Sequence, residues 1–341
     1  MPNFIAGIES LIEELLATCF NPISLLQLPK KKRIAKNGKI NKFFIVFWIC
    51  FIKTKKLYLK IKKMFKYLKQ SFARKKARRV FQEYGTKIDH FETKDFGDIA
   101  FANWLNPLMR KKVVTNEEIH FFKHYIPEGC LAIDIGANIG DLTVAMGIAA
   151  GKSGKVLAFE ANPIVFRILK ENSSINLEKS NIIPYNLAIT EKEELFYYAS
   201  SEASMSNGGL IKELSDNHHG KFKLNHPIQG VQLTQFLEEN YAQEILKLKF
   251  IKIDIEGFDF YVLQTISELI GKYRPTIIME VFYDLETEVR NNIFQFLKQF
   301  NYSLYNIKSF ENDFKVQPIP IQSEKEMPQK GISENLLAIM K

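Results

Sequence analysis

Two glycines and several polar side chains share the segment IDIGANIGD at residues 133–141, directly after an apolar run. Glycines at 136 and 140 let the backbone turn sharply and approach a ligand closely. A dinucleotide-binding G-x-G-x-x-G loop would need glycine where Asn138 and Asp141 stand, so the spacing argues against a pyrophosphate. Acidic groups and an asparagine can receive an ammonium, while backbone amides can hold a carboxylate. The segment therefore predicts a site for the methionine portion of S-adenosylmethionine, with a glycine turn that binds no ligand as the alternative.

An acidic residue, Glu160, ends the next apolar run and lies 24 residues after Gly136. If the two runs form neighbouring parallel strands, its carboxylate can accept both hydroxyls of a ribose. NAD carries the same ribose, so Glu160 does not by itself distinguish the two cofactors. The alternative is that Glu160 only caps the helix that Pro163 opens.

A second group of charges follows later, in the segment FIKIDIEG at 250–257. Strand alternation puts Lys252 and Asp254 on one face, and a lysine in an apolar strand needs a partner. Glu280, which ends the following apolar run, is the partner or neighbour that we expect. With Glu256 these carboxylates would meet at the carboxyl edge of the sheet, where open α/β sheets bind ligands. We predict Asp254 as the base, or as the group that holds an acceptor hydroxyl, with a purely structural ion-pair network as the alternative. We assign no metal, because nothing supports Mg²⁺ at these acids.

The elements that must position these residues alternate after residue 115, which is typical of a mostly parallel sheet covered on both faces. Residues 194–199 and 222–233 interrupt the alternation and predict a hairpin and a loop, while 334–340 predict a strand at the sheet edge. The polar stretch that holds His218, His219 and the serines and glycines of 204–209 is of the kind that often forms an active-site lid. For the two histidines the interpretations are a solvated loop or recognition of the acceptor. We expect strands at 131–135, 155–159, 182–185, 250–254 and 276–281, and helices at about 141–150, 163–176, 258–271 and 286–300.

Charge divides the chain into a basic arm and an acidic body. Residues 30–79 hold 20 Lys and Arg and no acidic residue, which leaves 27 basic against 38 acidic side chains elsewhere, a net charge of −11. We expect an arm at 1–80 and one catalytic domain at 81–341. Such arms bind polyanions, either nucleic acid or anionic lipid.

The apolar pattern within the arm favours a membrane surface. Ten apolar residues at 43–52 are about half of the length that a membrane span needs. From 55 to 73 an apolar stripe runs beside lysines, as in helices that lie on anionic membranes, after an amphipathic helical pattern within 1–29. Packing of 43–72 on the catalytic domain and contact with nucleic acid are the alternatives, of which nucleic acid is the less favoured. Three widely spaced cysteines indicate a reducing compartment, so we expect a cytoplasmic protein at the inner face of a membrane.

Together these motifs resemble the FkbM-type methyltransferase family. The matching segments are IDIGANIGDLT at 133–143, FEANP at 159–163, IKIDIEGFDFYVL at 251–263 and RPTIIME at 274–280. The resemblance implies a class I methyltransferase fold, which is a Rossmann-like, doubly wound sheet with an antiparallel edge strand. It implies that Asp254 and Glu256 face the reaction centre, and that the residues facing the cofactor are Asp134, Gly136, Asn138, Gly140, Glu160 and Asn162.

The resemblance also implies O-methylation, and we expect the acceptor to be a hydroxyl of a glycan, a glycolipid or a secondary metabolite. Two departures stand out. Leu233-Thr234-Gln235 replaces the acidic pair that the family usually shows after a leucine, and residues 1–80 have no counterpart in the family pattern. The alternatives are an RNA methyltransferase, which only the basic arm supports, and a non-catalytic membrane-binding protein with this fold.

Overall fold

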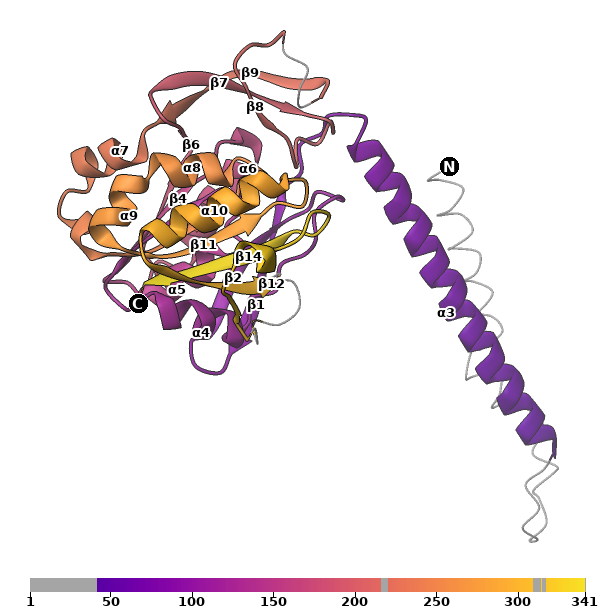
Figure 1. Ribbon diagram of the computed structural model, residues 1–341. Coiled ribbons are helices and arrows are strands. Elements are labelled where there is room, and N and C mark those ends of the chain that lie inside the picture. Colours follow the sequence, from indigo (N-terminus) through magenta and orange to yellow (C-terminus); the bar gives the residue numbers. More distant parts are fainter. Residues whose placement is uncertain (1–41, 216–219, 309–313, 315–316, 341) are drawn as a thin grey trace. The chain divides into compact units, whose positions relative to one another are not determined.

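The computed structural model describes residues 42–340 apart from 216–219, 309–313 and 315–316 (Figure 1). The chain divides into two compact units, one that ends at Lys76 and one that spans Ala77–Lys341. The helical pattern expected within 1–29 and the pair His218 and His219 lie outside the described residues.

The described part of the first unit is a single long helix, α3, which spans Lys42–Ala77. The apolar run at 43–52 and the amphipathic pattern at 55–73 thus belong to one continuous helix. Within the described residues, no helix combines the length and the apolar character that crossing a membrane requires.

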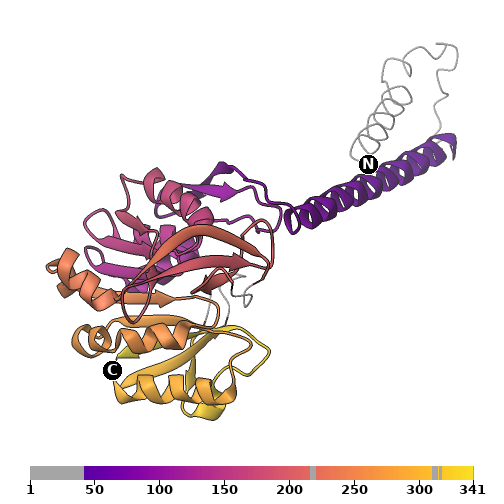
Figure 2. The same cartoon turned by 90° about the horizontal axis from the view of Figure 1, so that it is seen from above.

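An eight-stranded sheet forms the centre of the second unit (Figures 1 and 2). Five of its strands are parallel neighbours, and they are the five that the sequence predicts. In spatial order the sheet contains β13 (Ile319–Ile321), β12 (Tyr302–Lys308), β14 (Glu334–Met340), β11 (Thr276–Val281), β10 (Leu248–Ile253), β3 (Leu131–Ile135), β4 (Lys155–Phe159) and β5 (Ile182–Tyr185).

The sheet is mostly parallel with an antiparallel edge, as the class I methyltransferase fold requires. At the edge, β13 pairs antiparallel with β12. The edge position predicted for 334–340 is wrong, because β14 lies inside the sheet and pairs antiparallel with both β11 and β12. The final strand thus has neighbours on both sides, which explains why its middle residues, Leu336, Leu337 and Ala338, are buried.

Two apolar cores cover the two faces of the sheet. Alternate residues of each strand point into different cores, so Ile251 and Ile253 join one core while Phe250 joins the other. This explains why the parallel strands are apolar throughout. One face packs against α4 (Asn116–Tyr125), α5 (Thr143–Ala150) and α6 (Pro163–Ile175). The other packs against α7 (Leu233–Asn240), α8 (Asp259–Thr265), α9 (Ser267–Tyr273) and α10 (Thr287–Gln299). The single helix predicted at 258–271 is therefore wrong, since α8 and α9 are separate.

A second, four-stranded sheet lies against the carboxyl end of β4. The segment 222–233 is not a loop but mainly a long strand that pairs antiparallel with the one beginning at Glu194. Ala161, next to the end of β4, packs against this sheet's small core of Ala188, Tyr198 and Ile228. Its strands are β6 (Ala188–Ile189), β7 (Glu194–Ser200), β8 (Gly209–Ile211) and β9 (Phe222–Val231).

A hairpin of β1 (Thr86–Thr93) and β2 (Gly97–Trp104) precedes the central sheet. Two asparagines, Asn172 in α6 and Asn176 directly after it, hold β2 by pairing with its backbone in both directions. Asn176 accepts from Ala100 N at 3.0 Å and donates to Ala100 O at 2.9 Å. Asn172 does the same at Ala102, at 2.7 and 3.1 Å. The side chains thereby satisfy buried backbone groups that would otherwise lack partners.

Candidate functional site

The loop after β3 is held by backbone contacts with both neighbouring strands. Gly136 N and Ala137 N both donate to Phe159 O at 3.0 Å, and Asp254 N donates to Ile135 O at 3.0 Å. Gly136 has φ +76°, and a Cβ there would lie 1.9 Å from Asp254 O. Only glycine fits this position, so the first glycine of the motif is required by the close approach of β3 to the turn after β10.

Asn138 and Glu160 connect this loop to the end of β4. Asn138 has φ +50°, and its side-chain Oδ1 accepts from Ile139 N at 2.8 Å. Glu160 accepts from Asn138 N at 2.9 Å through one carboxylate oxygen and from Asn162 N at 2.7 Å through the other. Burial raises the pKa of Glu160 to about 7. The helix cap is not Glu160 but Asn162, whose Oδ1 accepts from Ile164 N at 3.0 Å.

Asn162 is buried, and its side-chain groups are engaged within the protein. Besides capping α6, it donates from Nδ2 to Met205 O at 2.7 Å. Met205 belongs to the loop between β7 and β8, where Ser204 is also buried. Asn162 thus couples the second sheet to the end of β4. These contacts are a structural reason for an asparagine at this position.

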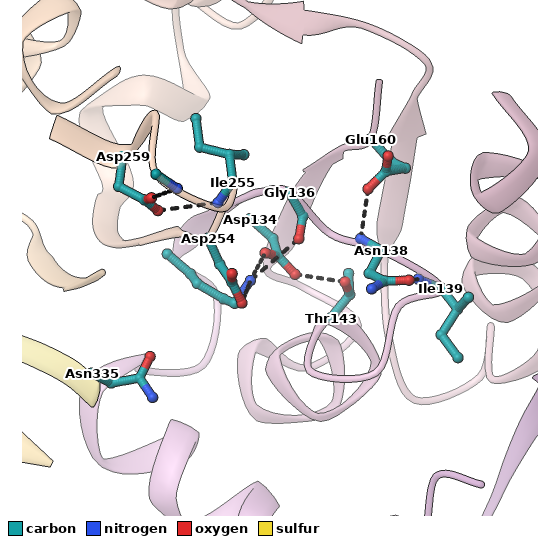
Figure 3. A network of polar contacts seen from close by, with 12 residues as sticks. Asp134, Gly136, Asn138, Ile139, Thr143, Glu160, Asp254, Ile255, Asp259 and Asn335 are labelled. Carbon is teal, nitrogen blue, oxygen red and sulfur yellow. Dashed lines mark hydrogen bonds and ion pairs between the residues drawn. The ribbon is translucent and has the colours of Figure 1, made fainter. Parts of the chain in front are cut away.

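Lys252 is buried between Asp134 and Asp254, the two acids that Figure 3 shows at the ends of neighbouring strands. Its Nζ lies 3.2 Å from Asp134 Oδ1 and 3.4 Å from Asp254 Oδ2, and it donates to Gly136 O at 3.3 Å. Burial alone would lower the pKa of Lys252, but Asp134, Asp254 and Asp141 outweigh that effect and raise it. The lysine therefore stays charged and draws the ends of β3 and β10 together.

Asp134 and Asp254 differ in exposure, which separates their roles. The Asp134 side chain is only 1% exposed, and its other oxygen accepts from Thr143 Oγ1 at 2.6 Å. The Asp254 side chain is 42% exposed and is open to solvent at the carboxyl edge of the sheet. Asp134 therefore holds the start of α5 and Lys252, while Asp254 can reach a ligand.

The turn after Asp254 is fixed by Asp259, a residue that the sequence analysis missed. Its carboxylate accepts from Ile255 N at 3.1 Å and from Gly257 N at 2.9 Å (Figure 3). Glu256, between them, adopts φ +52°, which is uncommon for a residue with a side chain. The signal was available, since an aspartate in the first turn of a helix after a glycine turn is suited to bind the free amides there.

Carboxylates outnumber cations at this edge of the sheet. Burial raises the pKa of Glu280 to about 7, and Asp254 raises it further. Burial also raises the pKa of Asp141 and of Glu256. Lys252 pairs with Asp134 and Asp254 rather than with Glu280, which is a neighbour. Among the described residues, no group of three or more potential ligands is arranged to hold a metal ion.

This charge distribution suits a cation. S-Adenosylmethionine carries a sulfonium and an ammonium, and the excess of carboxylates around the loop would stabilise both. Gly136, Asn138 and Glu160 lie together at the ends of β3 and β4, and Asp254 lies directly after the neighbouring β10. The roles of the individual residues toward the cofactor stay predictions.

The model of the methyltransferase FkbM domain matches residues 134–304, half of the chain. No curated protein sequence matches significantly. Among solved structures, an FkbM methyltransferase from Methylobacillus flagellatus is 14% identical with a TM-score of 0.38, over 62% of this chain and 44% of its own length. An S-adenosylmethionine-dependent O-methyltransferase from Thermotoga maritima is 12% identical with a TM-score of 0.34, over 75% of this chain and 78% of its own.

The family match contains the loop from Asp134, the acid Glu160 and the charged strand end at Lys252 and Asp254. The family match confirms S-adenosylmethionine, the cofactor that the loop predicts. The chain belongs to the FkbM methyltransferase family.

Proposed function

We propose that the protein transfers a methyl group to a hydroxyl of a glycan, a glycolipid or a secondary metabolite. The observation that supports this most directly is the position of Asp254. Its carboxylate is held by Lys252 at 3.4 Å, yet its side chain is 42% exposed at the carboxyl edge of the sheet. An oriented and accessible carboxylate is suited to hold an acceptor hydroxyl and to take its proton.

The chain's own residues have two tasks in this reaction. When bound, S-adenosylmethionine would supply a methyl group on a positively charged sulfur, whose bond to the methyl carbon would break and leave the neutral thioether S-adenosylhomocysteine. Asp254 orients the acceptor hydroxyl and accepts its proton as the hydroxyl oxygen forms its bond to the methyl carbon. Lys252, which is kept charged by Asp134 and Asp254, fixes the carboxylate so that little reorganisation is needed during transfer.

Glu256 and Glu280 complete the proposed acceptor side of the site. The pKa of both carboxyls is raised by burial and by Asp254, so each keeps its proton more readily than an ordinary glutamate. A protonated carboxyl can donate a hydrogen bond to an acceptor oxygen, as a sugar ring requires. We therefore propose a polyhydroxylated acceptor rather than an aromatic or apolar one.

The experiment is incubation of the full chain with isotopically labelled S-adenosylmethionine and a panel of free glycans, glycolipids and RNA. Labelled methyl that survives mild base identifies an ether, whereas base-labile label identifies an ester of a carboxylate acceptor. Label only on RNA, or only as an ester, would contradict the proposal.

The variant that tests Asp254 is Asp254→Asn. We expect cofactor affinity within about threefold of the parent and turnover lower by roughly 10²–10⁴-fold, the usual contribution of a general base. The matched control is Asp284→Asn, an exposed acid shortly after β11 that should leave turnover unchanged. A fully active Asp254→Asn would show that the carboxylate serves only the ion-pair network.

A further inference from the structure

The described end of α3 presents an apolar stripe between basic margins. Ile61, Met64, Leu68 and Phe72 recur every three or four residues, which puts them on one side of the helix. The Met64, Leu68 and Phe72 side chains are 52%, 36% and 49% exposed. Exposed large apolar side chains in a contiguous row mark an interaction surface rather than ordinary surface composition.

Basic residues flank this stripe on both sides. Lys60 is four residues before Met64, while Lys69 and Lys76 lie three residues before and four residues after Phe72. All three lysines are exposed. The helix Lys42–Ala77 contains no acidic residue, and none occurs anywhere in 30–79. The surface therefore combines apolar area with positive charge and lacks any group that would repel an anionic partner.

We propose that α3 lies on an anionic lipid surface, with Ile61, Met64, Leu68 and Phe72 inserted below the headgroups and Lys60, Lys69 and Lys76 among them. Long lysine side chains can reach the headgroups while their methylenes cover the apolar margin. A lipid surface offers both an apolar layer for the stripe and anionic headgroups for the lysines, whereas nucleic acid offers no apolar layer. The proposal does not depend on methyl transfer.

The test is flotation of the full chain with vesicles of neutral phosphatidylcholine and with vesicles that contain about one third phosphatidylglycerol. We expect binding to the anionic vesicles to be at least tenfold tighter. About 1 M NaCl, which shortens the Debye length to about 3 Å, should weaken this binding without abolishing it, because the apolar contribution does not depend on salt.

Two triple variants separate the contribution of the lysines from that of the apolar stripe. Both should leave α3 helical, since alanine and glutamine are good helix formers. Lys60→Gln, Lys69→Gln and Lys76→Gln together should lower the affinity for anionic vesicles on the order of 100-fold, at about 1 kcal/mol for each lysine. Met64→Ala, Leu68→Ala and Phe72→Ala together should abolish the binding that persists at high salt. Circular dichroism checks that both variants remain folded.

Matched controls come from exposed residues of the second unit. Lys247→Gln, Lys249→Gln and Lys325→Gln remove the same charge, and Leu177→Ala, Leu246→Ala and Ile332→Ala remove comparable apolar side chains. Both controls should bind vesicles like the parent. Any of four results would overturn the proposal. They are equal binding to neutral and anionic vesicles, complete release by salt, control variants that bind as weakly as the α3 variants, and binding of RNA in place of vesicles.

Discussion

At the scale of single residues, two positions of the site should not tolerate another residue type. They are Glu160, at the end of β4, and Gly136, in the loop after β3. Glu160 is already bound by two backbone amides, from Asn138 and Asn162, which fix both of its oxygens. A carboxylate oxygen can accept more than one hydrogen bond, so the same group can still bind ribose hydroxyls. Its role toward the cofactor is therefore open to direct measurement.

We expect Glu160→Gln to lower the affinity for S-adenosylmethionine by about 2–4 kcal/mol, since hydrogen bonds to a charged acceptor contribute about 1.5–3 kcal/mol each. Calorimetry with S-adenosylhomocysteine and its 2′-deoxy analogue distinguishes ribose binding from loop support. If Glu160 binds the ribose, the variant loses less affinity for the deoxy analogue than for the parent ligand. Equal losses for both ligands would mean that Glu160 acts only through Asn138 and Asn162.

Gly136 is the second such residue, for a steric reason. Gly136→Ala would place a Cβ 1.9 Å from Asp254 O, so the ends of β3 and β10 would have to separate. We expect a loss of at least about 3 kcal/mol in unfolding free energy, or no folded protein, because overpacking adds about 1–3 kcal/mol to the conformational strain.

The control for Gly136→Ala is Gly331→Ala. Gly331 also has a positive φ, at +95°, but nothing lies within 4 Å of a Cβ built there. That variant should lose only about 1 kcal/mol, the cost of the left-handed backbone alone. Chemical denaturation measures both losses, and equal losses would show that the contact with Asp254 O relaxes easily.

At the scale of elements, the sequence predicts the five parallel strands well because their period and length are distinctive. Burial on both faces produces mostly apolar strands of four to six residues, such as Leu131–Ile135. The hairpin of β1 and β2 was not predicted, and part of what holds it comes from Asn172 and Asn176, which bond to the backbone of β2 from more than 65 residues away. No local pattern reveals such a partner.

The same limit applies to the site. The residues on the loop and on β10 could be listed from their spacing, but not which of them pair. Glu280 was expected as the partner or neighbour of Lys252. It is a neighbour, and the lysine pairs instead with Asp134 on the other neighbouring strand, at 3.2 Å. Strand order, which places β3 beside β10, is a long-range property that alternation along one strand does not contain.

The asparagine contacts of β2 give a prediction at this scale. Asn172 bonds to Ala102 N, to Ala102 O and, at 2.8 Å, to Ile139 O in the cofactor loop. Asn172→Ala should lower the unfolding free energy by roughly 3–5 kcal/mol, since each buried backbone group left without a partner costs about 1–3 kcal/mol.

Asn172→Ala should also weaken cofactor binding, because Ile139 O belongs to the loop. The control is Asn240→Ala, an exposed asparagine whose hydrogen bond to Phe236 O at 2.9 Å is accessible to water. It should change stability by less than about 1 kcal/mol. Urea denaturation and cofactor titration on both variants provide the measurements, and equal effects would contradict the anchoring role.

At the scale of the whole molecule, buried acids determine how stability depends on pH. Burial raises the pKa of Glu118, Glu160, Asp259 and Glu280 to about 7 in each case. The usual values are about 4, so between pH 4 and 7 the folded protein retains protons that the unfolded chain has lost. Stability rises with pH only where the unfolded chain binds more protons, and here the opposite holds.

We therefore expect the unfolding free energy of the cofactor-free protein to fall as pH rises from about 5 to 8, by on the order of 1–3 kcal/mol for each such group. S-Adenosylmethionine should offset part of this loss, because its positive sulfur favours the ionised carboxylates. S-Adenosylhomocysteine, which lacks that charge, should offset less. Denaturation at pH 5, 6, 7 and 8 with each ligand measures the effect. Glu280→Gln should flatten the profile, and a stability that instead increases from pH 5 to 8 would refute the assignment of protonated acids at this site.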